Sequence, residues 1–581
     1  MKNKVDAVTL EIVGNLLLSI AEEVGICLIK SAYSTNIKER RDISTAMFDP
    51  DGNLAAQAEH VAMHLGSLLE IVKTVYQKYP KETIRPGDMF IGNDPYHGGG
   101  THLPDITVAA PAFFSGRLIG WTACCAHHSD VGGKVPGSTP GDAVDTFQEG
   151  LKIPLVKVAD GGVTRQDILE FIMANSRTPR ERYGDLEAQM ASCRIGIRRL
   201  EDAYKRYGDV LIDSMYELQD YAERRLKAGI AALPDGVYEF TDYMDDAGEA
   251  CPDPIKIHAS VAISGDRLSV DFTGTDAQVK GPINLTKNGL LATVFYCLKA
   301  LIDPEIPSNA GIYRALEVKA ADGLIVNAQE PSPVGERIDT AMRVADVIFG
   351  ALAPAVPERA MAGCNSSCTS ATFSGPNPED DGYTCVYLET IAGGSGASKE
   401  YDGLSGVQVH MTNTSNLPVE ALEMEFPLIL VRRYALRMDS GGSGKNRGGL
   451  GLTREFEVLC DASFTGLGDR QKIAPWGLNG GKAGAGGAQY LIRDGEKRHL
   501  PSKTTDLAVK RGDIIQINTP GAGGYGSPME RAENEVLLDV REGKVSISAA
   551  MTLYGTAIEE NNGEYVLLSE RTKQIRKERK L

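Results

Sequence analysis

Hydrophobic residues recur with a helical period near the start of the chain. From Thr9 to Lys30 they fall every three to four positions, with Glu22 and Glu23 on the opposite side. This spacing is typical of an amphipathic helix, and Asp6 or Thr9 would cap its first turn. We therefore expect a core helix at the beginning of the first domain.

Two hairpins are expected after this helix. Ile37–Gln57 alternates like a strand and contains a turn sequence. Ile106–Ala110 and Leu118–Ala126 alternate in the same way and flank the tight turn Ser115–Arg117. Between the two hairpins, Leu65–Tyr79 has the spacing of a helix.

The period changes to two near Gly236, which indicates that a new domain begins there. The residues before it are spaced as in packing helices, and many of those after it alternate as in an antiparallel meander. Helices are expected at Arg165–Asn175, Arg180–Tyr207, Val210–Leu233, Leu290–Ile302 and Ile338–Leu352, and strands at Val237–Tyr243, Ile255–Ile263 and Leu268–Thr273.

From Gly363 the pattern predicts strands and loops that are rich in glycine. Glycine at this frequency implies tight turns or close contact between backbones, and a surface for a partner chain. The end of the chain is different: it holds two short helices, Glu530–Arg541 and Ile547–Tyr554, before a basic tail at Arg571–Lys580.

These patterns predict an α+β (mixed α/β) multidomain fold, because 581 residues exceed what one hydrophobic core supports. An N-terminal α/β domain with metal-site hairpins and a helical segment is expected over residues 1–234. A mixed domain of β-meander and helices would follow over 235–360, then a β-rich, glycine-rich domain over 361–530 and a helical tail over 531–581.

Charge and cysteine usage narrow the class of protein. A net charge of −17 argues against a nucleic-acid surface, which needs a basic face. Ten cysteines without a framework spacing are typical of reduced thiols. Glu11, Glu22 and Glu23 interrupt the apolar run near the N-terminus, so neither a signal peptide nor a membrane span is expected. We predict a cytoplasmic protein.

Histidines gather between Gly92 and Asp130, where four of the nine in the chain lie: His97, His102, His127 and His128. Pro104 blocks an ordinary helix between His102 and Asp105, so this pair is expected on a loop that enters a strand. The hairpin would then return His127 and His128 to the side of His102.

Two imidazoles and a carboxylate that converge on one point form the ligand set of a divalent transition metal, and zinc, manganese and iron all fit it. Such a set leaves positions open for water or substrate, which favours a catalytic site. Gly98–Gly100 supports this interpretation, because glycine allows close approach of a backbone to a ligand. The alternative is a group of histidines that are hydrogen-bonded inside a glycine-rich loop.

Other residues have open roles at this point. Asp42 follows Arg40 and Arg41 at the entrance of the first hairpin, where it is either part of a buried Arg–Asp pair or a metal ligand. Either His60 or His64 would support the site from outside the ligand set. Gly132–Gly150 is interpreted as a loop beside the substrate that acts as a lid.

No nucleotide site is found in the sequence. Gly442–Lys445 resembles a phosphate-binding loop, but Asn446 follows the lysine and Asp439 replaces the first glycine. A dinucleotide fingerprint and a Ser nucleophile elbow are also absent. If ATP is used, another subunit must bind it.

Several motifs resemble the B subunit of the ATP-dependent hydantoinase and oxoprolinase family, which is related to the alpha subunit of acetone carboxylase. The resemblance runs nearly end to end. It is carried by Asn36–Asp42, His64–Ser67, Gly92–Tyr96, Thr101–Asp105, Asp271–Thr275 and Thr519–Gly521.

The resemblance implies a hetero-oligomer with an A-type subunit of actin-like fold, which binds ATP and Mg and phosphorylates the carbonyl substrate or makes carboxyphosphate. It implies a divalent metal in this chain at the matching positions Asp42, His102 and His127, with Asp105 and His128 next to them.

Hydrolysis of a small cyclic amide, such as a hydantoin, N-methylhydantoin or 5-oxoproline, is the favoured reaction. His128, Asp105 and His97 are the candidates for proton transfer. Carboxylation of an acetone-type ketone and a non-catalytic scaffold are the alternatives.

Overall fold

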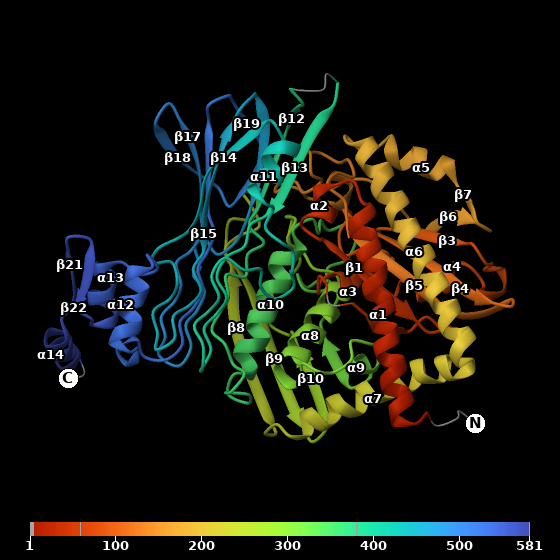
Figure 1. Ribbon diagram of the computed structural model, residues 1–581, viewed down its shortest axis with the longest axis horizontal. Coiled ribbons are helices and arrows are strands. Elements are labelled where there is room, and N and C mark those ends of the chain that lie inside the picture. The colour runs from red at the N-terminus through yellow and green to blue at the C-terminus, as the bar shows by residue number, and fades with distance from the viewer. Residues whose placement is uncertain (1–4, 59, 379–381, 580–581) are drawn as a thin grey trace.

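The computed structural model describes residues 5–58, 60–378 and 382–579 (Figure 1). Helices make up 32% of the chain and strands 26%, in several antiparallel sheets, which confirms the predicted mixed α/β class. In Figure 1 the N-terminal part lies on the right, the central part below, and the glycine-rich part on the upper left, with the C-terminal residues at the far left.

A seven-stranded sheet organises the N-terminal part, in the order β2-β1-β5-β4-β3-β6-β7. Its strands are β1 (Ile43–Phe48), β2 (Leu54–Gln57), β3 (Met89–Gly92), β4 (Asp105–Phe114), β5 (Arg117–His127), β6 (Val156–Asp160) and β7 (Val163–Thr164). The β4–β5 hairpin was predicted, and its register places Asp105 directly opposite His127.

Both faces of this sheet are covered, so its central strands are apolar on both sides. Alternate residues of β5 belong to different cores: Trp121 and Cys125 pack with the central part, whereas Cys124 and Ala126 pack with helices of the N-terminal part. Those helices include α1 (Ala7–Ser31), α5 (Gln166–Met173) and α6 (Pro179–Tyr207), while α7 (Asp209–Ala231) packs in the neighbouring cores. All four were predicted within a few residues.

Helix α1 is capped as expected, since Asp6 Oδ1 accepts hydrogen bonds from the backbone amides of Val8 and Thr9. By length and composition alone α1 is long enough to cross a membrane. The same description fits a core helix, and here Val13, Leu17 and other residues of one face are fully buried against α6, α7 and the sheet.

Two predicted elements near the site were wrong in detail. The residues before β1 form the short helix α2 (Thr35–Lys38) instead of a strand, because the Ser34 side chain accepts from Ile37 N and starts a turn. The predicted helix over Leu65–Tyr79 is split into α3 (His64–Leu68) and α4 (Ile71–Lys78), with Glu70 in a non-helical conformation between them.

The central part contains the predicted meander, extended by one parallel strand. Its sheet has the order β11-β10-β9-β8, and helices cover one face. The elements are β8 (Gly236–Met244), β9 (Ile255–Ser264), β10 (Arg267–Asp271), β11 (Leu316–Lys319), α8 (Lys287–Ile302), α9 (Gly311–Arg314) and α10 (Arg337–Leu352). Every residue of α10 is buried, so this helix is the centre of the molecule.

The glycine-rich part is built on two antiparallel sheets, in the orders β13-β12-β16-β19 and β14-β15-β20-β17-β18. Their elements are β12 (Ser370–Pro376), β13 (Thr384–Thr390), β14 (Ile429–Leu436), β15 (Leu452–Val458), β16 (Ala462–Leu467), β17 (Ala488–Arg493), β18 (Glu496–Leu500), β19 (Lys503–Val509) and β20 (Ile514–Asn518), with α11 (Val419–Glu425) beside them.

Below β15, extended glycine-rich segments run side by side (Figure 1). They are hydrogen-bonded to one another through their backbones, as Gly394 N donates to Pro520 O and Ala522 N to Gly449 O. A Cβ at Gly394 would lie only 2.1 Å from Gly449 O. The predicted close contact of backbones is therefore found within the chain itself.

The last described residues form a small module with its own hydrophobic core. It contains the two predicted helices, α12 (Glu533–Arg541) and α13 (Ile547–Tyr554), followed by the hairpin β21 (Ile558–Asn561) and β22 (Glu564–Leu567) and by α14 (Ser569–Arg579). Lys580 of the predicted basic tail lies outside the described residues.

The glycine packing generates a stability prediction. A Cβ at Gly396 would lie 1.8 Å from Ala362 O, a backbone atom that cannot move aside. We expect Gly396→Ala to lower stability by about 3 kcal/mol or more, seen as an earlier thermal unfolding transition. Gly468→Ala is the control, because its Cβ would meet nothing closer than 3.4 Å. Equal unfolding of the two variants would contradict this account.

Candidate metal centre

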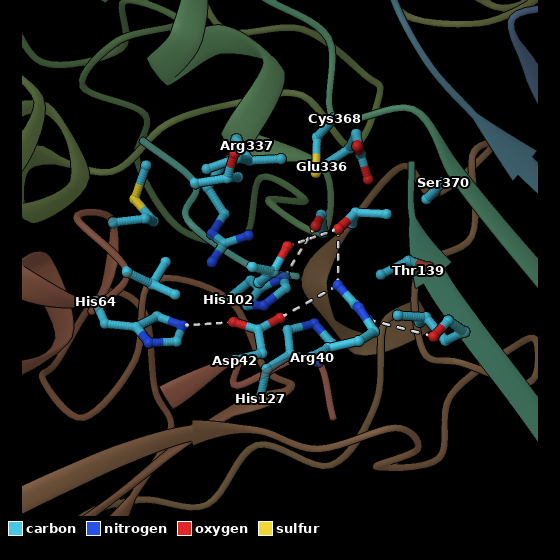
Figure 2. Close-up of a pocket in the computed structure, with 18 residues that line it drawn as sticks. Arg40, Asp42, His64, His102, His127, Thr139, Glu336, Arg337, Cys368 and Ser370 are labelled. Carbon is cyan, nitrogen blue, oxygen red and sulfur yellow. Dashed lines mark hydrogen bonds and ion pairs between the residues drawn. The ribbon is translucent and has the colours of Figure 1, made fainter. Parts of the chain in front are cut away.

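A cavity of about 50 Å³ lies where the three large parts of the chain meet. Figure 2 shows its labelled residues, with Asp42, His64 and His127 from the N-terminal part on one side and Glu336 and Arg337, at the start of α10, on the other. The lining residues are Arg40, Asp42, Val61, Met63, His64, His102, His127, Thr139, Gly335, Glu336, Arg337, Ile338, Cys368, Ser370, Leu388, Thr390, Thr412 and Thr414.

His102, Asp105 and His127 form a buried group beside this cavity. One ligand atom of each lies within 4.8 Å of the ligand atoms of the other two. The hairpin explains the arrangement, because Asp105 begins β4, His127 ends β5, and the two are paired across the ladder. His102 precedes β4 in the loop, and its ring centre is 4.9 Å from that of His127.

The hydrogen bonds of His102 leave a gap that a cation would fill. Its Nδ1 lies 2.9 Å from the carbonyl oxygen of Gly335, which can only accept, so Nδ1 carries the proton. In a neutral ring, Nε2 then presents a lone pair to Asp105 Oδ1 at 3.0 Å, and both atoms are acceptors. Burial, helped by Arg337, lowers the pKa of His102, which disfavours a second ring proton. The donor set therefore fits a divalent cation.

The other site groups also have ionisation states that suit a cation. Burial and the neighbouring His102 hold the pKa of His127 well below its ordinary value, which keeps the ring neutral. Burial alone would raise the pKa of Asp105, but His102, Arg337 and His64 outweigh it and hold that pKa well below its ordinary value. The site thus combines neutral imidazoles with a charged carboxylate.

Asp42 takes part in both of the arrangements considered from the sequence. It lines the cavity, and its Oδ2 lies 3.6 Å from Nη2 of the buried Arg40. Arg40 Nη2 also donates to Thr390 Oγ1 at 2.7 Å, which joins the N-terminal part to the glycine-rich part. The backbone carbonyl of Asp42 accepts from His127 N at 3.0 Å, so the two candidate ligands are fixed to each other.

His64 connects the two carboxylates. Its Nε2 lies 3.5 Å from Asp42 Oδ1 and 3.3 Å from Asp105 Oδ1. Burial would lower the pKa of His64, but Asp105 and then Asp42 raise it above the ordinary value. A protonated His64 offsets the negative charge of the carboxylates. His60 lies elsewhere, with its Nε2 3.9 Å from Glu22.

Two neighbours of the site were not recognised from the sequence. Arg337 donates from Nη2 to Asp105 Oδ2 at 2.8 Å and from Nε to Thr101 Oγ1 at 3.0 Å. Glu149 accepts from Val334 N at 3.0 Å and Gly335 N at 2.6 Å, and so holds the peptide whose carbonyl orients His102. Burial raises the pKa of Glu149 to about 8.

Gly132–Gly150 forms part of the wall of the cavity. Thr139 lines it, while Glu149 fixes the end of the loop. Glu336 is a third residue that the sequence did not identify. It lines the cavity, and its Oε1 is buried with no hydrogen-bond partner among the described residues. Burial, with the nearby Asp339, raises the pKa of Glu336 well above its ordinary value.

Two predicted proton-transfer residues are not brought to the cavity. His128 follows the last residue of β5, His127, and its side chain points away from the cavity toward α6. Its Nε2 lies 2.9 Å from Gln189 Oε1 on α6. His97 is 67% exposed and contacts Asp94 at 3.1 Å.

A second buried group contains Asp346, Cys364 and His410. Hydrogen bonds account for it: Asp346 Oδ1 accepts from Cys364 N at 3.1 Å and from His410 Nε2 at 3.0 Å. Arg470 donates to Oδ2 at 2.7 Å, and its positive charge disfavours another cation. Cys368, four residues after Cys364, lies at the first cavity instead.

The family model for hydantoinase B/oxoprolinase matches residues 6–528. The chain belongs to this family. It is 34% identical to the B subunit of a putative D-/L-hydantoinase from Pseudomonas sp., over 99% of this chain and 98% of that one. A crystal structure of the ATP-dependent caprolactamase from Pseudomonas jessenii superposes with a TM-score of 0.90 at 31% identity, over 99% of this chain and 100% of that one.

Acetone carboxylase shares the fold of this chain, with a TM-score of 0.92 at 20% identity over 99% of this chain and 83% of that one.

The family also includes longer chains. 5-Oxoprolinase 1 of Arabidopsis thaliana is 36% identical over 90% of this chain, which spans 42% of its length. Long relatives of this kind match 90–91% of this chain, whereas those named as subunits match 96–99%.

The contact of Glu149 with the 334–335 peptide generates a prediction for ion binding. Glu149→Gln keeps the size of the side chain but replaces one acceptor oxygen by an NH2 group that faces a backbone N–H. The peptide should turn away and release His102, and we expect affinity for a bound divalent ion to fall roughly 10- to 100-fold. Titration with zinc or manganese measures this.

The matched control is Glu330→Gln. Glu330 contacts Lys152 and His97 at the surface, away from the cavity. If both variants bind the ion like the wild type, Glu149 does not position His102.

Proposed function

We propose that this chain is the metal-containing B subunit of an ATP-dependent enzyme that opens a small cyclic amide of the hydantoin, N-methylhydantoin or 5-oxoproline type. The observation that carries the proposal is the convergence of His102, His127 and Asp105 beside a cavity whose wall includes Asp42. Family membership supports the reaction class, because the relatives include hydantoinase and caprolactamase subunits.

The ion would be held by His102 and His127 with Asp105 and Asp42 as carboxylates. When bound, it would polarise a carbonyl oxygen and make water more acidic. Asp105 already accepts from Thr101 and Arg337, so its role is to hold the ion and these donors rather than to accept a proton. Zinc, manganese and iron all suit this donor set.

The remaining cavity residues serve the chemistry of an amide. An amide nitrogen leaves only when it is protonated, and the raised pKa of Glu336 keeps a proton on a carboxyl that faces the cavity. His64 supplies positive charge behind the carboxylates. His64, His102 and Glu336 are buried, and burial strengthens their electrostatic interactions.

Activation of the amide by ATP is assigned to an A-type subunit that binds ATP and Mg. The sequence has no phosphate-binding loop, and the relatives whose names call them B or beta subunits are themselves parts of larger enzymes. We place the complex in the cytoplasm, in keeping with ten free cysteines.

Removal of either imidazole should remove the ion. We expect His102→Ala and His127→Ala, purified in full length, to contain less than about a tenth of the wild-type ion by elemental analysis, since each loses one of only four donors. His97→Ala is the control and should retain the ion, because His97 is exposed and outside the cavity. Full occupancy in both His102→Ala and His127→Ala would refute the assignment.

The reaction itself is tested with the reconstituted complex. Given ATP and a panel of cyclic amides, it should open one of them with cleavage of ATP, while this chain alone should neither bind nor hydrolyse ATP. A parallel incubation contains acetone and labelled bicarbonate. Fixation of the label into an acid, with no amide consumed, would replace the hydrolase by a carboxylase.

A further inference from the structure

The residues after position 528 lie outside the family model, which matches residues 6–528. The long relatives match 90–91% of this chain. Residues 6–528 make up about the same fraction of the 581 residues. Relatives named as separate subunits match 96–99% and therefore extend beyond that share. These shares are consistent with a C-terminal module, residues 529–579, that accompanies the chains named as subunits.

This module is a distinct body at one end of the molecule, remote from the N-terminal sheet (Figure 1). Val536, Val540 and Tyr554 belong to a hydrophobic core that is separate from the larger cores. A charged joint attaches it to the glycine-rich part: Arg531 donates to Asp402 at 2.7 Å and lies 2.8 Å from Asp539. The module therefore has a fixed position without contributing to the cavity.

The surface of the module has the properties of a binding surface. Leu538, Leu553 and Val566 are 52%, 45% and 42% exposed, on three different elements. Helix α14 adds five basic residues against two acidic ones, in a chain whose net charge is −17. Exposed apolar side chains and a basic helix in one module favour an acidic protein partner.

We propose that the C-terminal module docks the separate ATPase subunit through its exposed apolar residues and the basic helix α14. The inference rests on the proposed function. In the long relatives, more than half of the polypeptide is covalently joined to the part that resembles this chain, so no docking element is needed between the two. A module that joined two copies of this chain would be equally useful in long relatives and in separate subunits. Self-association therefore does not explain why the module goes with the separate subunits.

The test uses full-length protein, because deletion of the module would remove Arg531 from Asp402 and Asp539 from Arg447, which lies 3.4 Å from it. Leu538→Glu and Lys577→Glu, alone and combined, change exposed side chains of α12 and α14. We expect the dissociation constant for the purified A-type subunit, measured by calorimetry, to rise at least about 10-fold in the double variant. Its ion content and thermal unfolding should stay at wild-type values, and saturating A-type subunit should restore activity.

Phe171→Glu is the matched control. Phe171 is 63% exposed on α5, in the N-terminal part, and its substitution should leave the affinity unchanged. Wild-type affinity in the double variant, with an active wild-type complex, would overturn the docking proposal and leave the proposed function standing. A change in self-association of this chain instead, seen by light scattering, would also overturn it. A wild-type chain that binds no A-type subunit would overturn both proposals.

Discussion

The buried carboxylate of Asp105 ties together the segments that build the cavity. Its Oδ2 accepts from Thr101 and Arg337, and its Oδ1 faces His102 and His64 at 3.0 and 3.3 Å. Burying such a charge is unfavourable by several kcal/mol unless partners surround it. These partners come from the hairpin loop, from α3 and from α10, so a satisfied Asp105 requires all three to be in place.

Helix α10 also carries buried charged side chains whose partners come from another part of the chain. Asp339, Arg343 and Asp346 are spaced along one side of a helix that has no solvent-facing surface, and each is paired with the glycine-rich part. Asp339 accepts from Cys368 N, Arg343 lies 2.7 Å from Asp469, and Asp346 pairs with His410. This polar stripe fixes the glycine-rich part on the central part, and so fixes the wall of the cavity that residues 368–414 supply.

The parts of the site that are close in sequence could be predicted. The β4–β5 hairpin is local, so alternation and one turn sufficed to bring His127 to Asp105. The clustering of histidines does not tell whether His127 or His128 faces the cavity, because the register of the strand decides this. Glu149 lies in the predicted Gly132–Gly150 loop, but its role and that of Arg337 could not be predicted, since their partners lie far away in sequence. From the sequence alone, the polar stripe on α10 predicts a face exposed to solvent. Only the tertiary contacts show that it is buried.

The size of the cavity constrains how a substrate can reach the candidate ligands. About 50 Å³ holds a few waters, whereas pockets that enclose small molecules are typically about 300–1,000 Å³. A cyclic amide therefore needs one wall to move. The β4–β5 hairpin is buried in the sheet and cannot move without loss of the ligand geometry. The wall supplied by the glycine-rich part is joined to the N-terminal part through Arg40, whose guanidinium reaches Leu388 O and Thr390 Oγ1. Exchange of these contacts would leave the pairing of Asp105 with His127 in the β4–β5 hairpin intact, so movement at this boundary is compatible with the ligand geometry.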